Sequence, residues 1–166
     1  GGEVEAFYSG YTAPLLDGQS PRASMVEGGI NAEHLWPQSL GAGELPARSN
    51  MHILVPAREN VNSARSNFAF GDIPPENVDT WYRGTVSQNV APPESEQRTW
   101  SRVFEDADNR SQSRFEPRDV GKGEVARALF YFQLVYPGRA DGSFCSTPAG
   151  VARLSFLAPL LMCVAF

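Results

Sequence analysis

The chain has 166 residues, 42% of them hydrophobic and 20% charged, and its formal net charge is −5 at pH 7. This length fits one domain with a sizeable core, and the composition excludes a disordered or fibrous protein. The negative charge excludes binding of nucleic acid by general neutralisation of phosphates, so a nucleic-acid partner would need a local basic groove.

The first half of the chain predicts short elements separated by loops. Residues 1–29 are loop-rich, with an apolar run at 6–8 that predicts a short strand. No charged start followed by an apolar core is visible, so the chain as given shows no signal peptide. Residues 51–55, Met-His-Ile-Leu-Val, predict a buried strand that Pro56 is expected to stop. The helix-tolerant residues 57–67 then predict a short helix.

The second half contains one clear helix. Residues 73–117 are polar and rich in Pro, Asn and Ser, which predicts surface loops with one strand at 99–104. The helix follows at about 123–136, where one apolar face recurs at i, i+4, i+7 and i+11 through Val125, Leu129, Phe132 and Tyr136. Pro137-Gly138 is expected to end it.

The C-terminal segment 154–166 is almost wholly apolar. It is shorter than the roughly 20 residues that a membrane helix needs, and it contains Pro159, so we expect no membrane association. We expect the segment to be buried or covered by a partner. Cys145 and Cys163 can form at most one disulfide and match no zinc pattern, and whether they pair stays open.

Glu33 and His34 are adjacent residues that together suggest catalysis. A neutral imidazole can accept a proton from water, and a carboxylate can hold a hard cation through oxygen. Phosphodiester cleavage needs both, because a base makes the nucleophile and a cation neutralises charge on the phosphate and the leaving oxygen. In a strand the two side chains would point to opposite faces. By itself, such a pair is more often a solvated carboxylate beside a hydrogen-bonded histidine.

A second cation ligand would have to come from another element. The predicted helix at 57–67 offers the amide oxygens of Asn60, Asn62 and Asn67. Magnesium accepts this ligand type alongside waters. The residue types alone do not choose among the three asparagines.

Four sequence blocks extend the pattern over about two-thirds of the chain. They are Asn31-x-Glu33-His34-x-Trp36-Pro37-x-Ser39-Leu40, Asn50-Met51-His52-Ile53-Leu54-Val55-Pro56, Asn62-x-x-Arg65-x-Asn67-x-x-Phe70-Gly71 and Phe115-Glu116-Pro117-Arg118-Asp119-x-x-Lys122-Gly123-Glu124-Val125-Ala126-Arg127-Ala128-x-Phe130-Tyr131. In this order the blocks resemble the bacterial endonuclease I family of His-Me finger nucleases. Four ordered blocks are more specific than any one of them.

The resemblance implies an α+β fold with a ββα-metal (His-Me finger) core, additional helices and long loops. We expect a single nuclease domain over 1–166, with the core motif at about 30–72 and the family helix at about 117–136. The resemblance further implies that His34 deprotonates water while Glu33 and Asn62 hold one divalent ion. Mg²⁺ is the expected ion, with Mn²⁺ and Ca²⁺ as alternatives.

The activity implied by the resemblance is cleavage of DNA, RNA or both with little sequence preference, leaving 5′-phosphates. Such enzymes are usually exported, so we expect a secreted or periplasmic protein, acting as a monomer. Arg65 would share a helix face with Asn62 and is the first candidate for a phosphate contact, ahead of Arg48 and Arg58. An internal salt bridge or a plain surface position is an equal alternative for Arg65.

The remaining singled-out residues are predicted to be structural. We expect His52 to lie in the core or to bond to backbone, and Trp36 and Phe70 to pack. Glu116 and Lys122 flank the start of the last helix, where we expect them to cap it or to form an ion pair.

The chain departs from the family pattern at several points. The family usually has an acidic residue and often a second histidine where this chain has Asn50 and Ile53, and it usually begins with an extra helical segment. The apolar tail also has no match. Two alternatives therefore stand beside the nuclease: a non-catalytic nucleic-acid or protein binding module, and a metal-stabilised structural domain in which His34 is idle.

Overall fold

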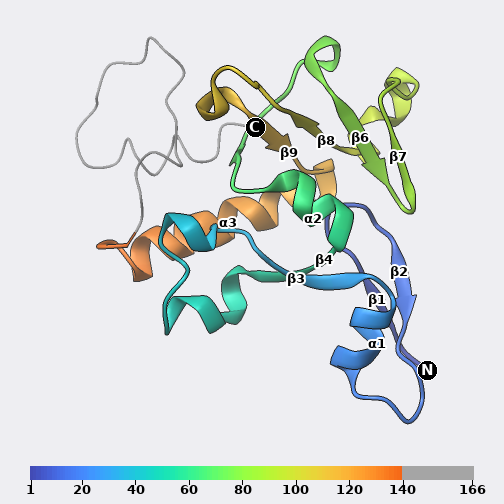
Figure 1. The fold of residues 1–166 in the computed structure, drawn as a ribbon, viewed down its shortest axis with the longest axis vertical. Helices are drawn as coiled ribbons and strands as arrows, with labels where there is room; N and C mark the ends of the chain where they lie inside the picture. Colours follow the sequence, from blue (N-terminus) through green and yellow to red (C-terminus); the bar gives the residue numbers. More distant parts are fainter. Residues whose placement is uncertain (140–166) are drawn as a thin grey trace.

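A computed structural model describes residues 1–139 of the chain (Figure 1). It contains α-helices and mostly antiparallel sheets, which confirms the predicted α+β class. The α-helices in this part of the chain are α1 (Pro21–Glu27), α2 (Glu59–Arg65) and α3 (Asp119–Val135). The strands are β1 (Glu3–Glu5), β2 (Thr12–Pro14), β3 (Ile30–His34), β4 (Leu54–Arg58), β5 (Ala69–Phe70), β6 (Thr80–Arg83), β7 (Val86–Gln88), β8 (Ser101–Phe104) and β9 (Arg114–Glu116).

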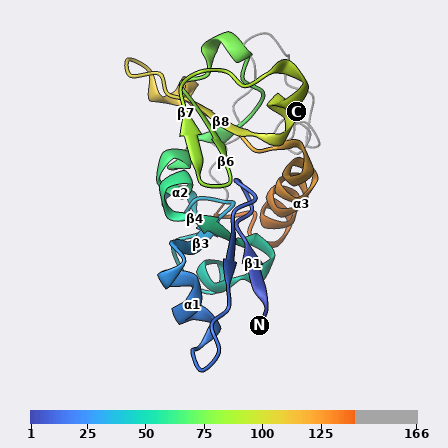
Figure 2. The same cartoon turned by 90° about the vertical axis from the view of Figure 1, so that its right-hand side faces the viewer.

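The described strands form three separate sheets. β1 pairs with β2, β3 pairs with β4, and the remaining strands form a five-stranded sheet in the order β5-β9-β8-β6-β7. The short β5–β9 pair is parallel, and the other pairs are antiparallel. Figures 1 and 2 show the five-stranded sheet at one end of the molecule and β1, β2 and α1 at the other. β3, β4, α2 and α3 lie between them, in the middle of the molecule.

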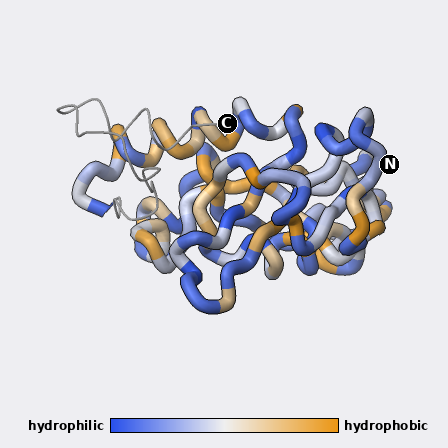
Figure 3. Tube along the Cα trace, turned by 90° about the horizontal axis from the view of Figure 1, so that it is seen from above, coloured by the Kyte–Doolittle hydropathy of each residue, from blue (hydrophilic) through white to orange (hydrophobic). Residues whose placement is uncertain are grey.

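One buried core joins these middle elements to the five-stranded sheet, and it includes Trp36, Val61, Phe115 and Phe132. Trp36 stacks on Phe132 with ring centroids 4.5 Å apart, which confirms the packing role predicted for Trp36. Burial of apolar surface is the main favourable term in folding, and stacked aromatic pairs add to it. Hydrophobic and hydrophilic stretches alternate along the trace in Figure 3, so the core draws on many short segments.

Helix α3 is the predicted family helix, and it begins earlier than the apolar pattern indicated. Its buried face includes the predicted Val125, Leu129 and Phe132. Gly121, in the first turns, disfavours a helix by propensity. The structure explains this residue, because an added Cβ there would lie 3.0 Å from the Phe7 ring. A side chain at 121 would therefore require the Phe7 ring to shift.

β3 and β4 pair over their whole lengths and lead directly into α2, so the expected ββα arrangement is present. The strand predicted at 51–55 is wrong in its bounds, because Met51–Ile53 forms a 3-10 turn and β4 continues through Pro56. The Pro56 carbonyl accepts a hydrogen bond of 2.8 Å from the Phe7 N–H, on the side away from β3. A proline at such an outward position costs the β3–β4 ladder no hydrogen bond.

Two further predictions are wrong. Residues 6–8 form the turn between β1 and β2 rather than a strand, since the Ala6 N–H bonds to the Tyr11 carbonyl. Residues 73–117 were predicted to be surface loops with one strand at 99–104. That strand is β8, but the segment also contains β6, β7 and β9 and so most of the five-stranded sheet. These strands are only three or four residues long, so turn-forming residues dominate the composition of the segment and hide them.

Several predictions remain untested. Cys145, Cys163 and the apolar segment 154–166 lie outside the described residues. None of the helices within residues 1–139 combines the length and the hydropathy needed to cross a membrane. The single domain over 1–166 and the monomeric state stay predictions.

Candidate active site

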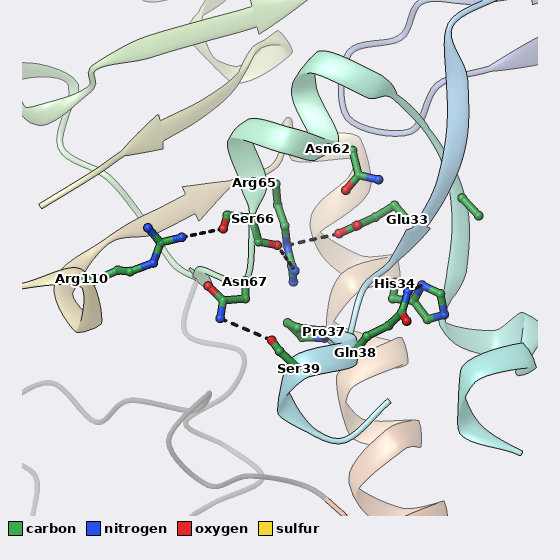
Figure 4. A pocket seen from close by; sticks show the side chains of 11 residues that line it. Glu33, His34, Pro37, Gln38, Ser39, Asn62, Arg65, Ser66, Asn67 and Arg110 are labelled. Carbon is green, nitrogen blue, oxygen red and sulfur yellow. Dashed lines mark hydrogen bonds and ion pairs between the residues drawn. The ribbon is translucent and has the colours of Figure 1, made fainter. Parts of the chain in front are cut away.

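A polar cleft of about 490 Å³ lies between β3, the loop that follows it and the C-terminal end of α2 (Figure 4). It contains the Glu-His pair and the predicted ligand Asn62. The structure therefore brings together three residues that the sequence assigned to one site. Its lining residues are Ala32, Glu33, His34, Pro37, Gln38, Ser39, Asn62, Arg65, Ser66, Asn67 and Arg110.

Glu33 is a buried carboxylate, with 4% of its surface exposed. Its Oε1 accepts a hydrogen bond of 2.8 Å from the Tyr8 hydroxyl and lies 3.2 Å from Nε of Arg65. Burial raises the pKa of the Glu33 carboxyl above its ordinary value, although Arg65 and the Tyr8 hydroxyl act in the opposite direction. A cation at the cleft would offset this cost by favouring the ionised carboxylate.

His34 has both ring nitrogens in hydrogen bonds. Nε2 lies 2.8 Å from the Arg48 carbonyl, and the side-chain amide nitrogen of Gln38 lies 3.2 Å from Nδ1. A carbonyl can only accept, so the bond to Arg48 places the ring hydrogen on Nε2. The lone pair of a neutral His34 is then on Nδ1, where Gln38 donates to it. Two hydrogen bonds of opposite sense thus fix the tautomer.

Asn62 lies on α2 and projects toward the same space as Glu33 (Figure 4). Its side-chain nitrogen donates a 2.8 Å hydrogen bond to the amide oxygen of Asn31 on β3. This bond fixes the orientation of the Asn62 amide and leaves its oxygen as the atom that could accept a cation. Asn67 also lines the cleft, whereas Asn60 lines a different hollow beside Arg58. Of the three asparagines, Asn62 is the one that faces Glu33 across the ββα unit.

The donor set of the cleft fits a hard divalent cation. Within residues 1–139 no group of three or more His, Cys, Asp or Glu side chains is arranged so that it could hold a metal ion. The cleft instead supplies one carboxylate from Glu33 and one amide oxygen from Asn62. Mg²⁺ is commonly held by one or two protein oxygens and keeps several waters, so this sparse oxygen-only set suits it.

Arg65, the first candidate for a phosphate contact, is 1% exposed. Besides its ion pair with Glu33, it donates to the carbonyls of Leu35 at 2.8 Å and Ser66 at 3.0 Å. Its guanidinium lies 4.6 Å from the centroid of the Phe70 ring, which confirms the packing role of Phe70. Of the two alternatives for Arg65, these contacts favour the internal salt bridge.

The two lower-ranked arginines do not line the cleft. Arg48 has an exposed side chain, and its carbonyl is the group that contacts His34. Arg58 lies over the Tyr11 ring, 5.0 Å from its centroid, in a separate hollow.

The structure adds residues that sequence reasoning missed. Tyr8 reaches Glu33 from the N-terminal turn, and Arg110 reaches the cleft from the loop before β9. Neither lies within the motif blocks, so spacing could not reveal them. Gln38 was detectable in principle, because it lies four residues after His34, just beyond the end of β3.

His52 is exposed, so the predicted core position is wrong. The 3-10 turn at Met51–Ile53 directs Ile53 inward and leaves His52 at the surface, where its ring lies 4.6 Å from that of Tyr131. The neighbouring Asn50, which departs from the family pattern, donates to the hydroxyls of Tyr131 and Tyr136. It therefore ties the segment before β4 to the end of α3.

Glu116 and Lys122 form the predicted ion pair, with Nζ 2.8 Å from Oε1. Glu116 also accepts hydrogen bonds from the Arg102 guanidinium and from the Ile73 N–H. Burial alone would raise the pKa of this carboxyl, but these donors outweigh it and lower the pKa below its ordinary value. This cluster holds β8, β9 and α3 together, and none of its members lines the cleft.

Fold and cleft define an α+β protein in which a ββα unit carries a glutamate, a histidine and an asparagine into one polar cleft. A sequence profile described as Endonuclease I matches residues 6–143, which is most of the chain. The chain belongs to the Endonuclease I family.

Two curated relatives are similar over most of this chain. An extracellular ribonuclease of Bacillus amyloliquefaciens is 34% identical over 137 residues, which cover 77% of this chain and 37% of the relative. An extracellular ribonuclease of Bacillus subtilis (strain 168) is 35% identical over 131 residues, which cover 75% of this chain and 36% of the relative. The match thus spans little more than a third of the length of either relative.

Proposed function

We propose that this protein is a metal-dependent nuclease that hydrolyses phosphodiester bonds in RNA, DNA or both. The observation that carries the proposal is the meeting of Glu33, His34 and Asn62 at one polar cleft. Membership of the Endonuclease I family and similarity to two proteins named extracellular ribonucleases support it. Because of those relatives, RNA is the first substrate to test.

His34 is the proposed general base. With its Nε2 hydrogen given to the Arg48 carbonyl, Nδ1 carries the lone pair that takes a proton from water. The hydroxide attacks phosphorus, and the bond to the 3′ oxygen breaks. The leaving oxygen takes up a proton from solvent, which leaves a 5′-phosphate. In the structure the side-chain amide of Gln38 is bonded to Nδ1. For water to reach Nδ1, this amide must turn aside or bond to the attacking water instead.

Glu33 and Asn62 are the proposed ligands of the cation, with Mg²⁺ expected and Mn²⁺ or Ca²⁺ as alternatives. When bound, the cation would neutralise negative charge on the phosphate and on the leaving oxygen. Arg65 and Tyr8 would hold the Glu33 carboxylate toward the cleft through their contacts with Oε1. In this proposal Arg65 acts through Glu33, and Arg48 acts on His34 through its backbone carbonyl.

Three broader expectations belong to the same proposal. The residues that line the cleft are mostly polar, and contacts of polar groups with the phosphate backbone would suit cleavage with little sequence or sugar preference. Export is expected because both curated relatives are named extracellular. A single domain acting as a monomer remains the expected form.

Cleavage assays on the purified chain test the proposal. Wild type, His34→Ala and His52→Ala are incubated with RNA, single-stranded DNA and plasmid DNA, in Mg²⁺ or in EDTA. We expect EDTA to abolish cleavage and His34→Ala to slow it by about 10²–10⁴-fold, the usual contribution of a general base. His52→Ala is the matched control, because it removes an exposed histidine outside the cleft and should leave the rate within a factor of about two.

Two results of these assays would contradict the proposal. Wild type that is folded by circular dichroism yet inert in Mg²⁺, Mn²⁺ and Ca²⁺ would overturn the nuclease and favour a binding module. Equal rates for His34→Ala and wild type would remove His34 as the base.

A further inference from the structure

Arg110 extends the candidate site beyond the motif residues. It begins a 3-10 turn, Arg110–Gln112, just before β9, and it lines the same cleft as Glu33 and His34. Of the two arginines that line the cleft in residues 1–139, Arg65 is buried and engaged with Glu33, whereas the Arg110 side chain is 60% exposed. Figure 4 shows it approaching Ser66 from the side opposite His34.

Two contacts orient the Arg110 guanidinium. Its Nη2 donates a 2.7 Å hydrogen bond to the Ser66 hydroxyl, and its carbon lies 4.8 Å from the centroid of the Phe68 ring. Glu105 lies 3.5 Å from Nη1, but that carboxylate is itself 57% exposed, and exposed pairs of this kind are weak. A cation held by one hydroxyl and one ring face keeps most of its donors for another partner.

Ser66, whose hydroxyl accepts from Arg110, has an unusual backbone conformation. Its φ is 53°, the one positive value among the non-glycine residues of the described chain. The turn is closed by a 3.2 Å hydrogen bond from the Phe68 N–H to the Arg65 carbonyl. Glycine would adopt this φ at lower cost, and what serine adds at this position is the hydroxyl that accepts the hydrogen bond from Arg110.

We propose that Arg110 is a phosphate-binding residue for the nucleic-acid strand in this cleft and that Ser66 positions it. This inference rests on the proposed nuclease function and names the group that meets the backbone of its substrate. A chain of net charge −5 needs a local cation wherever it receives a polyanion. An arginine fork that is exposed and already oriented meets that need with little ordering cost.

Binding of fluorescein-labelled 20-nucleotide single-stranded RNA and DNA, measured by anisotropy in Mg²⁺, tests the inference. All variants carry His34→Ala in the full chain, so that the probe stays intact. We expect Arg110→Ala to weaken binding about 10-fold and to reduce the slope of log K against log salt by about 0.7, the value for one phosphate contact on a single strand. Arg127→Ala is the charge-matched control, since Arg127 is exposed, pairs with Glu124 at 3.6 Å and lies on α3 outside this cleft.

Two Ser66 variants separate positioning from fold maintenance. Ser66→Ala and Ser66→Gly both remove the hydroxyl, and each should weaken binding about 3-fold while keeping the salt slope. Ser66→Gly should melt about 3 °C above Ser66→Ala, because it relieves the positive φ. In the Arg110→Ala background, removal of the hydroxyl should have no further effect on binding.

The outcomes also separate this inference from the proposed function. If wild type cleaves RNA or DNA but Arg110→Ala binds both probes with the affinity and salt slope of its parent, the inference fails and the nuclease stands. An equal loss in Arg127→Ala would likewise overturn it, because the effect would then be net charge alone. If wild type neither binds nor cleaves, the proposed function fails first.

Discussion

Glu33 and Glu116 are buried to a similar extent, but their contacts differ and their pKa values shift in opposite directions. Glu116 is 2% exposed, and both of its oxygens accept hydrogen bonds, from Arg102, Lys122 and the Ile73 N–H. Glu33 is 4% exposed, and its contacts with Tyr8 and Arg65 both involve Oε1. The pKa of the Glu116 carboxyl is lowered and that of the Glu33 carboxyl is raised. The donors around Glu116 thus outweigh the effect of burial on its pKa, whereas at Glu33 the effect of burial outweighs that of Arg65, Tyr8 and His34.

The largest effect is expected on cleavage, when the charge of Glu33 at the cleft is removed. Glu33→Gln keeps the shape of the side chain but removes the charge proposed to hold the cation, so we expect cleavage to fall by about 10²–10³-fold. Cleavage rates at saturating Mg²⁺ measure the loss. Glu116→Gln, assayed below its melting temperature, is the control and should keep a near-normal rate. Comparable losses in both variants would refute the division of roles.

The second test is stability. Glu116→Gln leaves Arg102 and Lys122 beside a neutral partner in a mostly buried cluster, so we expect the free energy of unfolding to fall by about 3 kcal/mol. Urea unfolding at neutral pH measures it. Glu124→Gln serves as the control, because its exposed pair with Arg127 contributes less than about 1 kcal/mol. A Glu116→Gln effect no larger than the control would contradict the structural role.

The smallest expected effect is a difference in how the two carboxyl groups change the free energy of unfolding with pH. The pKa of Glu116 is lowered in the folded state, so its stabilisation is present above the unfolded value of about 4.3 and is lost as pH falls through the folded pKa. The pKa of Glu33 is raised, so its contribution is present below about pH 4.3 and is lost as pH rises through the folded pKa.

Urea unfolding of wild type, Glu33→Gln and Glu116→Gln in EDTA, at several pH values between about 3 and 8, checks these signs. The stability difference between wild type and Glu116→Gln should shrink as pH falls. The difference between wild type and Glu33→Gln should shift in favour of the variant as pH rises. Parallel pH profiles for the two variants would show that the two carboxylates do not differ.

The sequence predicted the parts of the site that lie close together in the chain. Glu33 and His34 are adjacent, Asn62 follows on the predicted helix, and the structure gathers the three at one cleft. The apolar face of α3 was readable because a 17-residue helix repeats its pattern several times. The strands of the five-stranded sheet were not, because a strand of three or four residues offers too few alternations to rise above its turn-rich surroundings.

The amino-acid sequence therefore indicated the family, the ββα order and the residues of the candidate site, through the resemblance that its four ordered blocks carry. Only the tertiary structure decided that Arg65 is an internal partner of Glu33, that His52 is exposed, and that Pro56 continues a strand. It also brought Tyr8 and Arg110 to the site from distant segments. Burial, charge pairing and the direction of a side chain depend on which segments pack together, and that is a property of the whole fold rather than of any local pattern.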